Sequence, residues 1–369
     1  MKFDVAIIGA GMAAASLAAE LAPHLSVAIL EAESHAGYHS TGRSAAFWSE
    51  TYGGPLIQPL TSASAAFLAK PPAGFGDGSF LRRRRSIHVA QANEAALLDI
   101  MLAEFEGSVE LQRLDRPELE RSIPGLLPGW DEGVLEPTCA DIDVAALHQA
   151  YLGSARRAGA QIMLDAPLGQ ARRSNGWRLE TAQREVEAAI LVNAAGAWAD
   201  HVAELGEVAA VGVRPYRRTI SQLRIDPPVP AELPLIIDAL GRFYFKPEAG
   251  GRLWLSPHDE TPCEACDSAP EEYDVALAID RLSQIVDWRV ERVEHSWAGL
   301  RSFAPDRLPV YGFADERRDF FWCAGQGGFG IQTAPAAAKL AAALLLGIEP
   351  DPMVAGIDPA PYLATRFTN

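Results

Sequence analysis

Residues 4–33, DVAIIGAGMAAASLAAELAPHLSVAILEAE, decide the fold of this chain. Val5 to Ile8 form a short apolar run that is typical of a buried parallel strand. Small residues then continue with helical character until Pro23, which ends the helix. A second apolar run, Val27 to Leu30, leads directly to Glu31. The stretch therefore predicts a strand, a helix and a second strand that is parallel to the first.

The turn between the first strand and the helix carries the pattern G-x-G-x-x-A, which is typical of dinucleotide-binding proteins. Gly9 permits the tight turn, Gly11 lets the backbone approach a pyrophosphate, and Ala14 lets the helix pack closely on the strand. The helix N-terminus favours phosphate, and Glu31 is placed to accept hydrogen bonds from ribose hydroxyls. An ordinary strand–helix turn without a ligand is the alternative. The predicted cofactor-binding residues of this unit are Gly9, Gly11, Ala13, Ala14, Glu31 and Ala32.

The composition is that of a soluble globular protein, with 49% apolar and 22% charged residues. The 369 residues are enough for two domains and a substantial core. A net charge of −16 argues against nucleic acid or an anionic lipid surface as a general partner. The longest apolar stretch, PAAAKLAAALLLG at 335–347, is interrupted by Lys339 and is too short to span a membrane. Because the first strand begins almost at Met1, we expect a cytoplasmic protein without an integral membrane segment.

The four cysteines, Cys139, Cys263, Cys266 and Cys323, are scattered along the chain. Cys263 and Cys266 form a CxxC pair, but no second pair accompanies them, and a structural zinc site usually needs four ligands. We therefore expect an exposed loop here and no metal site.

A second segment, HSTGRSAAFWSETYG at 39–53, places small residues around Arg43. Small side chains and free backbone amides suit a segment that lies along an extended cofactor, whereas a nicotinamide enzyme would continue with alternating strands and helices. This run resembles a cofactor-contacting segment of the D-amino-acid oxidase-like FAD oxidoreductases, which include glycine and sarcosine oxidases. Within that family the resemblance is greatest to the bacterial D-arginine dehydrogenases. Three more stretches extend it over nearly the whole chain: ILVNAAGAWAD (190–200), HSWAGLRSFAPDRLPVYG (295–312) and FFWCAGQGGFGIQTAPAAAKLAAALL (320–345).

The resemblance implies FAD that is bound without a covalent link. The helix that ends the last segment would point its N-terminus at the glycine-rich loop. A helix dipole there favours the negative charge of a reduced flavin. The cofactor-binding residues that the resemblance implies are Ser40, Thr41, Gly42, Arg43, Ser44, Ala45, Ala46, Ala195, Gly196, Gly327, Phe329, Gly330, Ile331, Gln332 and Thr333.

The resemblance also implies a site for an amino-acid substrate. Arg301, in WAGLRSF, matches the arginine that binds the substrate carboxylate, and Arg218 matches a second arginine of the pocket. Arginine is suited to this task because it is planar, always charged and able to form two parallel hydrogen bonds. Arg217 competes for the second assignment because it is adjacent to Arg218. Tyr52 and Tyr244 match pocket tyrosines, and Gly328 would offer a carbonyl to the substrate amine.

Two positions depart from the D-arginine dehydrogenase pattern. Ser86 stands where those enzymes have a glutamate that holds the basic side chain, and Phe47 stands where they have a histidine. A buried guanidinium without a carboxylate partner would cost several kcal/mol, so we expect a neutral or apolar substrate side chain. If Arg84, Ser86 and His88 share one face of a strand that lines the pocket, an acidic D-amino acid would fit instead. A solvated basic run is the alternative for these arginines.

The resemblance implies an α/β fold in two interleaved parts. A Rossmann-like FAD-binding domain with a parallel sheet is expected from residues 1–80, 136–212 and 293–369. An α+β substrate-binding domain on an antiparallel sheet is expected from 81–135 and 213–292. Four stretches have strand-like alternation that suits the second domain: RRSIHVAQ (84–91), RRTISQLRI (217–225), RFYFKPEAG (242–250) and GRLWLSP (251–257).

These features predict FAD-dependent oxidative deamination of a D-amino acid to a 2-oxo acid and ammonia, with hydride transfer to the flavin. Oxidation of a secondary amine of the sarcosine or glycine type, or of a 2-hydroxy acid, is an alternative that uses the same arginine clamp. A non-catalytic FAD-binding subunit is an alternative of another class. The expected partners are a small-molecule substrate and an electron acceptor, which is a quinone, a carrier or oxygen. Trp254 matches a lysine that helps oxygen react in the sarcosine-oxidase branch, and this favours a dehydrogenase although Lys246 lies nearby.

Overall fold

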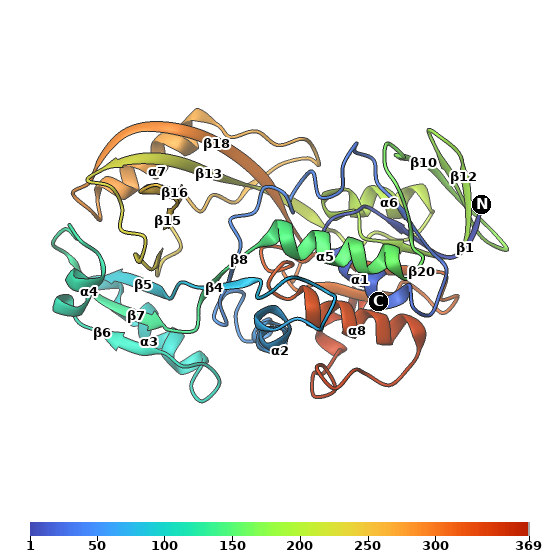
Figure 1. Ribbon diagram of the computed structural model, residues 1–369, viewed down its shortest axis with the longest axis horizontal. Coiled ribbons are helices and arrows are strands. Elements are labelled where there is room, and N and C mark those ends of the chain that lie inside the picture. The colour runs from blue at the N-terminus through green and yellow to red at the C-terminus, as the bar shows by residue number, and fades with distance from the viewer. Residues whose placement is uncertain (368–369) are drawn as a thin grey trace.

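The structure is a computed structural model that describes residues 1–367. Its strands form two large sheets and a small one, and Figure 1 shows the two large sheets at opposite ends of the molecule. The eight-stranded sheet has the order β10-β11-β12-β1-β2-β9, with β20 beside β12 and β19 beside β20. Its strands are β1 (Lys2–Ile8), β2 (Val27–Leu30), β9 (Gln161–Met163), β10 (Leu168–Ser174), β11 (Gly176–Thr181), β12 (Glu185–Asn193), β19 (Val310–Phe313) and β20 (Phe320–Ala324).

The centre of this sheet is parallel and confirms the predicted strand–helix–strand unit. Strand β1 pairs in parallel with β2 on one side and with β12 on the other, and Val5 lies opposite both Val27 and Ile190. Helix α1 (Met12–Leu21) joins β1 to β2, and every residue of β2 is buried. The unbroken apolar character of these strands is that of a sheet covered on both faces.

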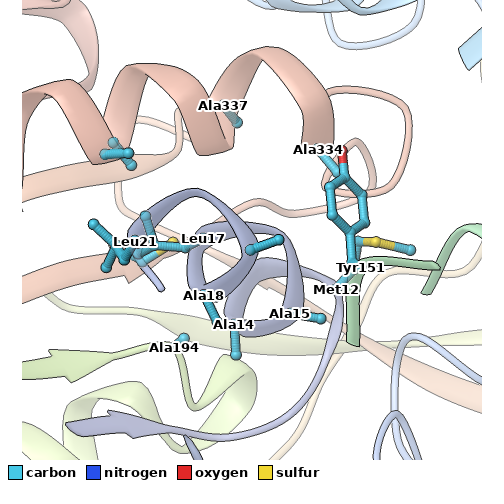
Figure 2. Packing of buried hydrophobic residues seen from close by; sticks show 14 of the residues in the cluster. Met12, Ala14, Ala15, Leu17, Ala18, Leu21, Tyr151, Ala194, Ala334 and Ala337 are labelled. Atoms are coloured by element: carbon cyan, nitrogen blue, oxygen red, sulfur yellow. The ribbon is translucent and has the colours of Figure 1, made fainter. Parts of the chain in front are cut away.

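Helix α1 lies between the sheet and two other helices, α5 (Val144–Arg157) and α8 (Ala334–Leu346). Ala14 and Ala18 point toward Ala194, which follows β12, whereas α8 with Ala337 lies on the opposite side of α1 (Figure 2). Because Ala14 and Ala18 are fully buried methyl groups, the helix lies close to the sheet. Helix α6 (Ala199–Leu205) contributes to the core on the other face of the sheet.

The nine-stranded sheet has the order β17-β13-β16-β15-β14-β5-β7-β6, with β18 beside β13. All its pairs are antiparallel except that of β14 with β5, so the predicted α/β fold with an antiparallel second sheet is confirmed. The four stretches predicted as strands all contribute to it. The strands are β5 (Ser86–Gln91), β6 (Gln112–Leu114), β7 (Trp130–Glu136), β13 (Arg214–Asp226), β14 (Leu235–Asp238), β15 (Tyr244–Glu248), β16 (Arg252–Ser256), β17 (Thr261–Pro262) and β18 (Arg289–Phe303).

Strand β18 runs from the nine-stranded sheet to the centre of the molecule (Figure 1). It pairs with β13 from Arg289 to Phe303, and the pairing is regular from His295 to Phe303. The expected domain boundary at residue 293 therefore falls inside β18, and residues 293–303 belong to the nine-stranded sheet.

The remaining elements complete both ends of the molecule. Three short strands form the small sheet, and helices α3, α4 and α7 belong to the region of the nine-stranded sheet (Figure 1). Among residues 1–367, no helix combines the length and the apolar character that crossing a membrane requires. These elements are β3 (Phe47–Trp48), β4 (Leu81–Arg83), β8 (Ala140–Ile142), α2 (Gln58–Ala69), α3 (Ala95–Glu104), α4 (Arg116–Ser122) and α7 (Glu272–Ser283).

The conditional alternative for this part of the chain does not hold, because Arg84 does not share a strand with Ser86 and His88. Strand β5 begins at Ser86, and Arg85 has a left-handed φ of +66° that turns the chain before it. The Arg84 guanidinium instead donates to Asp141 at 2.6 and 2.9 Å. The basic run therefore does not form a strand face toward a pocket.

Leu17 tests the packing of α1. Leu17 is fully buried, so Leu17→Ala leaves a cavity and is expected to lower the free energy of unfolding by about 2–5 kcal/mol. Leu240→Ala is the control because Leu240 is 54% exposed, and its effect should stay within about 0.5 kcal/mol. Urea unfolding measures both. Equal losses in the two variants would contradict this account of the core.

Candidate active site

A cavity of about 470 Å³ takes its lining from both large sheets. One group of lining residues belongs to the first strand–helix–strand unit, at Gly9 to Ala13 and Glu31 to Glu33. The lining continues through most of segment 37–47 and through 194–198. It also includes Tyr52, Arg218, Tyr244 and Arg301, together with glycine-loop residues between Gln326 and Gln332. The cavity thus joins the dinucleotide motif to the predicted substrate residues.

The turn after β1 can be built only with glycine at its first position. Gly9 has a φ of +96°, and a Cβ atom there would lie 2.7 Å from the carbonyl oxygen of Ala194. A Cβ atom on Gly11 would lie 3.2 Å from Thr41 Oγ1. The Met12 amide, at the start of α1, donates to Thr41 Oγ1 at 3.0 Å. This close backbone, with a helix N-terminus behind it, fits the pyrophosphate of a dinucleotide.

Glu31 supplies a carboxylate to the same part of the cavity. Its Oε2 atom accepts a hydrogen bond from the Ala10 amide at 2.7 Å, and Oε1 accepts one from the Glu33 amide at 3.0 Å. These bonds fix the carboxylate at the end of β2. An acid at this place fits the ribose of an adenosine group, and the residues present therefore fit FAD.

Arg43 lines the cavity, but its guanidinium is engaged within the protein. It forms an ion pair with Asp267, and Nη1 donates to the carbonyl of Ser268 at 2.8 Å. Tyr38 also donates to Asp267, at 3.1 Å. Arg43 therefore binds segment 267–268 to the part of the cavity lining that it belongs to itself, a role that the sequence did not indicate.

The glycine loop before α8 reaches the predicted substrate residues. A Cβ atom on Gly328 would overlap the Tyr52 hydroxyl and would lie 3.1 Å from Arg301 Nη1. Helix α8 then begins at Ala334 and ends at Gly347, whose φ is +65°. The loop thus links the cofactor part of the cavity to the arginine that is predicted to bind substrate.

Most residues predicted to bind the cofactor line this cavity: Gly9, Gly11, Ala13, Glu31, Ala32, Ser40, Thr41, Arg43, Ser44, Ala45, Ala46, Ala195, Gly196, Gly327, Gly330, Ile331 and Gln332. Four others are placed elsewhere. Ala14 is part of the core behind the turn, and the amide of Gly42 donates to the Gly37 carbonyl at 2.7 Å. Phe329 lines a neighbouring cavity, and the Thr333 hydroxyl donates to the Phe329 carbonyl at 2.9 Å.

Arg301 and Arg218 present two guanidinium groups to one end of the cavity. Among residues 1–367, no carboxylate forms an ion pair with Arg301. Arg218 is buried, and its Nε and Nη2 atoms donate to the Asp259 carbonyl and to Glu260 at 2.7 and 3.2 Å. Its Nη1 atom is buried and has no partner within the described residues. Burial and the charge of Arg301 lower the pKa of Arg218 to about 10, so this end of the cavity favours an anion.

The structure also separates Arg218 from Arg217. Arg217 forms ion pairs with Glu271 and with Asp274, the latter at 3.0 Å. Neighbouring residues of a strand point to opposite faces, and here only Arg218 lines the cavity.

Aromatic side chains form the wall beside the two arginines. The ring centroid of Phe47 lies 5.3 Å from that of Tyr52 and 6.1 Å from that of Tyr244. The Arg301 guanidinium lies 5.7 Å from the centroid of the Tyr52 ring.

Ser86 was predicted to belong to this wall, but it does not line the cavity. It is fully buried, and its hydroxyl has no partner among the described residues. His88 is also absent from the lining, and burial lowers its pKa to about 4. Phe47, Cys139, Leu235 and Tyr244 form an apolar cluster in this region.

A second cavity of about 380 Å³ shares Tyr52 and Arg301 with the first. Its lining includes Phe303, Leu308 and Phe329, and Arg307 forms an ion pair with Glu260 there at 2.8 Å. His258 lies in the same lining, and burial together with the charges of Arg218 and Arg301 lowers its pKa to about 2. The sequence did not indicate His258 or Glu260, because no local motif marks a loop that only the fold brings to Arg218.

Lys246 and Trp254 do not line the first cavity. Lys246 donates to Asp141 at 2.8 Å, and its ammonium lies 5.1 Å from the Trp254 ring centroid. All four cysteines carry free thiols. Within residues 1–367, no three histidine, cysteine or acidic side chains gather as metal ligands would.

Comparison with known proteins gives consistent findings. Residues 4–344 match the family model described as DAO, FAD dependent oxidoreductase. The chain is 26% identical over 267 residues to hydrogen cyanide synthase subunit HcnC of Pseudomonas aeruginosa. The matched region covers 70% of this chain and 60% of that protein. It is 27% identical over 259 residues to human mitochondrial dimethylglycine dehydrogenase, covering 64% of this chain and only 30% of that protein. The crystal structure of glycine oxidase from Geobacillus kaustophilus superposes with a TM-score of 0.85 at 27% identity, and 99% of each chain is covered.

Gly9 provides a test of the cofactor cradle. Gly9→Ala adds a methyl group against the Ala194 carbonyl, and the purified variant should hold little flavin. Gly159→Ala is the matched control, because Gly159 has a φ of +100° but no atom lies within 4 Å of the place that the added methyl group would take. Both substitutions carry a backbone strain of about 1–3 kcal/mol, but only the first reaches the cavity. The measurement is the ratio of flavin to protein absorbance, and a wild-type ratio in Gly9→Ala would contradict the assignment.

Proposed function

This chain belongs to the DAO family of FAD-dependent oxidoreductases, and we propose that it oxidises a D-amino acid with a neutral or apolar side chain to a 2-oxo acid and ammonia. One observation carries the proposal. Arg301 presents to the cavity a guanidinium that no carboxylate of residues 1–367 neutralises, beside the glycine loop at Gly328. A guanidinium in this setting suits the carboxylate of an amino acid.

The reaction needs a neutral substrate amine. FAD, held by residues 9–13, Glu31 and the segment 37–47, would supply the acceptor for a hydride from the substrate α-carbon, and water would hydrolyse the imino product to the 2-oxo acid and ammonia. Arg301 and Arg218 orient the carboxylate, and their positive charges lower the pKa of an amine held beside them. The low pKa of His258 has burial as its largest cause and these same two charges as the next. The residues that line the first cavity beside Arg301, namely Tyr52, Arg218, Tyr244 and the loop 326–332, include no carboxylate. Glu260 and Asp306, which line the second cavity, pair with Arg307 and Arg366 at 2.8 and 2.7 Å. This agrees with a reaction that uses no strong base.

The amine has an acceptor for its hydrogen bond in the glycine loop. We assign this task to the Gly328 carbonyl, because Gly328 lies against both Tyr52 and Arg301. A substrate held by its carboxylate and its amine has its α-carbon fixed, which supplies the positioning that hydride transfer requires.

The surroundings of the site favour an uncharged side chain. Phe47, Tyr52 and Tyr244 form the wall, and the charged groups of the second cavity are paired with each other, as in Arg307 and Glu260. Ser86 itself carries no carboxylate for a basic side chain, and neither Ser86 nor the opposite strand residue Glu136 lines the first cavity. The D configuration rests on the resemblance described for the sequence.

Glycine or its N-methyl derivative is the second candidate substrate. The superposed structure is named a glycine oxidase, and one relative is named dimethylglycine dehydrogenase. Both substrates carry the same carboxylate and amine. A non-catalytic subunit is less well supported, because it would not need two arginines facing an apolar wall.

The positions of the lysines relative to the first cavity bear on the identity of the electron acceptor. No lysine of the described residues lines the first cavity, and Lys246 is bound to Asp141. This supports a dehydrogenase that passes electrons to a quinone or a carrier rather than to oxygen. The cytoplasmic location expected from the sequence is part of the same proposal.

The test is anaerobic flavin absorbance of the purified protein, titrated with D- and L-amino acids, sarcosine and 2-hydroxy acids. We expect neutral D-amino acids to bleach the oxidised flavin band. Bleaching by glycine and sarcosine alone would establish the second candidate, and bleaching by D-arginine would contradict the inference from Ser86.

Arg301 allows a direct prediction. Arg301→Met removes the carboxylate partner, and kcat/KM should fall by an amount equivalent to about 2–5 kcal/mol. Arg301→Lys keeps the charge but not the planar fork, so its loss should be smaller. Steady-state kinetics with the best substrate measures both. Equal activity of Arg301→Met and the wild type would remove this arginine from the site.

Arg218 allows a prediction about pH. The amine must be neutral, so kcat falls as the pH drops below the pKa of the bound amine. Removing one of two positive neighbours raises that pKa, and Arg218→Met should move the acidic limb of the kcat profile to higher pH by about one unit. Arg224→Met is the control, since Arg224 lies on the same strand but pairs with Glu294 at 2.8 Å. An unmoved limb, or one at lower pH, would contradict the assigned role.

A further inference from the structure

We propose that Glu136 is a positioning residue, which fixes the turn that carries Tyr52 into the substrate site. The inference rests on the proposed function, because it assigns Tyr52 to substrate binding. Glu136 is the last residue of β7 and does not line the cavity itself. Its influence would pass entirely through the residues that it binds.

The Glu136 carboxylate is fully buried and holds three consecutive residues. Oε2 accepts hydrogen bonds from the hydroxyls of Ser49 and Thr51 at 2.8 and 2.7 Å. Oε1 accepts one from the backbone amide of Glu50 at 2.7 Å. A single side chain therefore fixes both the backbone and the side chains of the turn that precedes Tyr52.

This carboxylate has no cation partner among residues 1–367. Burial raises its pKa, and the three hydrogen bonds oppose that rise. An apolar residue of similar volume would avoid the cost of removing a charge from water. The overall fold gains little from an acid at this place, so its effect is the local order of residues 49–51.

A second side chain holds the same turn from the glycine loop. Gln332 accepts a hydrogen bond from the Ser49 amide at 3.2 Å and donates to the Tyr52 carbonyl at 3.1 Å. Its amide nitrogen also donates to the Thr61 hydroxyl at 2.9 Å. Glu136 and Gln332 thus connect Tyr52 to the nine-stranded sheet and to the cofactor loop.

The chain on the far side of Tyr52 is tied back to the same turn, because the Gly54 amide donates to the Thr51 carbonyl at 3.3 Å. Gly53 and Gly54 follow directly, with left-handed φ values of +103° and +82°. Glycine adopts this region without strain, so these two residues limit the direction of Tyr52 less than other residues would. The bonds at residues 49–51 act together with the Gln332 bond to the Tyr52 carbonyl and with the packing of the ring on Phe47 and Phe329. They therefore contribute to the place of the tyrosine ring against Arg301 and Gly328.

The test measures the binding of benzoate, used as a carboxylate probe, by the change in flavin absorbance of the loaded protein. Glu136→Gln and Thr51→Val should each raise the dissociation constant about fivefold to tenfold, because each removes a hydrogen bond to a buried charge or the charge itself. Thr51→Ser keeps the hydroxyl and should stay within about twofold of the wild type. Flavin content should remain unchanged in all three.

Asp238→Asn is the matched control for loss of a buried carboxylate. Asp238 is also buried, but it binds Arg242 at 2.7 Å and does not contact residues 49–52. The Asp238→Asn substitution should lower the melting temperature without weakening the binding of benzoate. If Thr51→Val behaves like Asp238→Asn, with a lower melting temperature and unchanged probe binding, Glu136 is only structural and the proposal is wrong.

A double-mutant cycle shows whether the effect passes through Tyr52. In a Tyr52→Phe background, Thr51→Val should weaken benzoate binding by less than it does in the wild type. If Thr51→Val raises the dissociation constant by the same factor in the Tyr52→Phe background as in the wild type, the proposal is wrong. Probe binding with the expected losses, but no oxidation of any amino acid, would refute the proposed function and leave the role of Glu136 intact. Absence of any benzoate signal in the wild type would refute both.

Discussion

The backbone of Gly9 lies against the carbonyl of Ala194, and the rest of the site depends on this close approach. A side chain at residue 9 would separate β1 from the segment that follows β12. With glycine there, residues 9–13 and 194–198 line one cavity. The same turn presents the Ala10 amide to Glu31 and so fixes the acid at the end of β2. A steric requirement at one backbone atom thereby sets the shape of the cofactor cradle.

The other part of the site depends on charge. The chain has a net charge of −16, yet it keeps Arg301 free of a carboxylate partner among the described residues and leaves Nη1 of Arg218 unpaired. Burial and the charge of Arg301 both disfavour the charged form of the Arg218 guanidinium. In the proposed function, a bound carboxylate would offset this repulsion. The pair of guanidinium groups would then favour an anionic ligand, and the aromatic wall would limit which anions fit.

The sequence predicted the parts of the fold that depend on local patterns. Val5 to Ile8, the glycine turn and Val27 to Leu30 were correctly placed because period, turn chemistry and small helix residues all agree there. The sequence left the place of Arg84 open, because alternation alone does not show that Arg85 takes a left-handed conformation. His258, Glu260 and Glu136 were missed for another reason. Their surroundings come from strands and loops that are distant in sequence, and no spacing along the chain reports such contacts.

Strand β18 reaches from the nine-stranded sheet to the cavity at the centre of the molecule, and this limits which changes of sequence the site tolerates. Ser40 binds the Leu300 carbonyl at 2.6 Å, while the next residue, Arg301, faces the substrate end of the cavity. From His295 to Phe303 the strand pairs with β13 without a bulge. Inserting one residue in this stretch would turn every later side chain to the opposite face, including Arg301. Exchanging side chains around this strand leaves the direction of Arg301 intact, whereas changing its length between His295 and Arg301 does not.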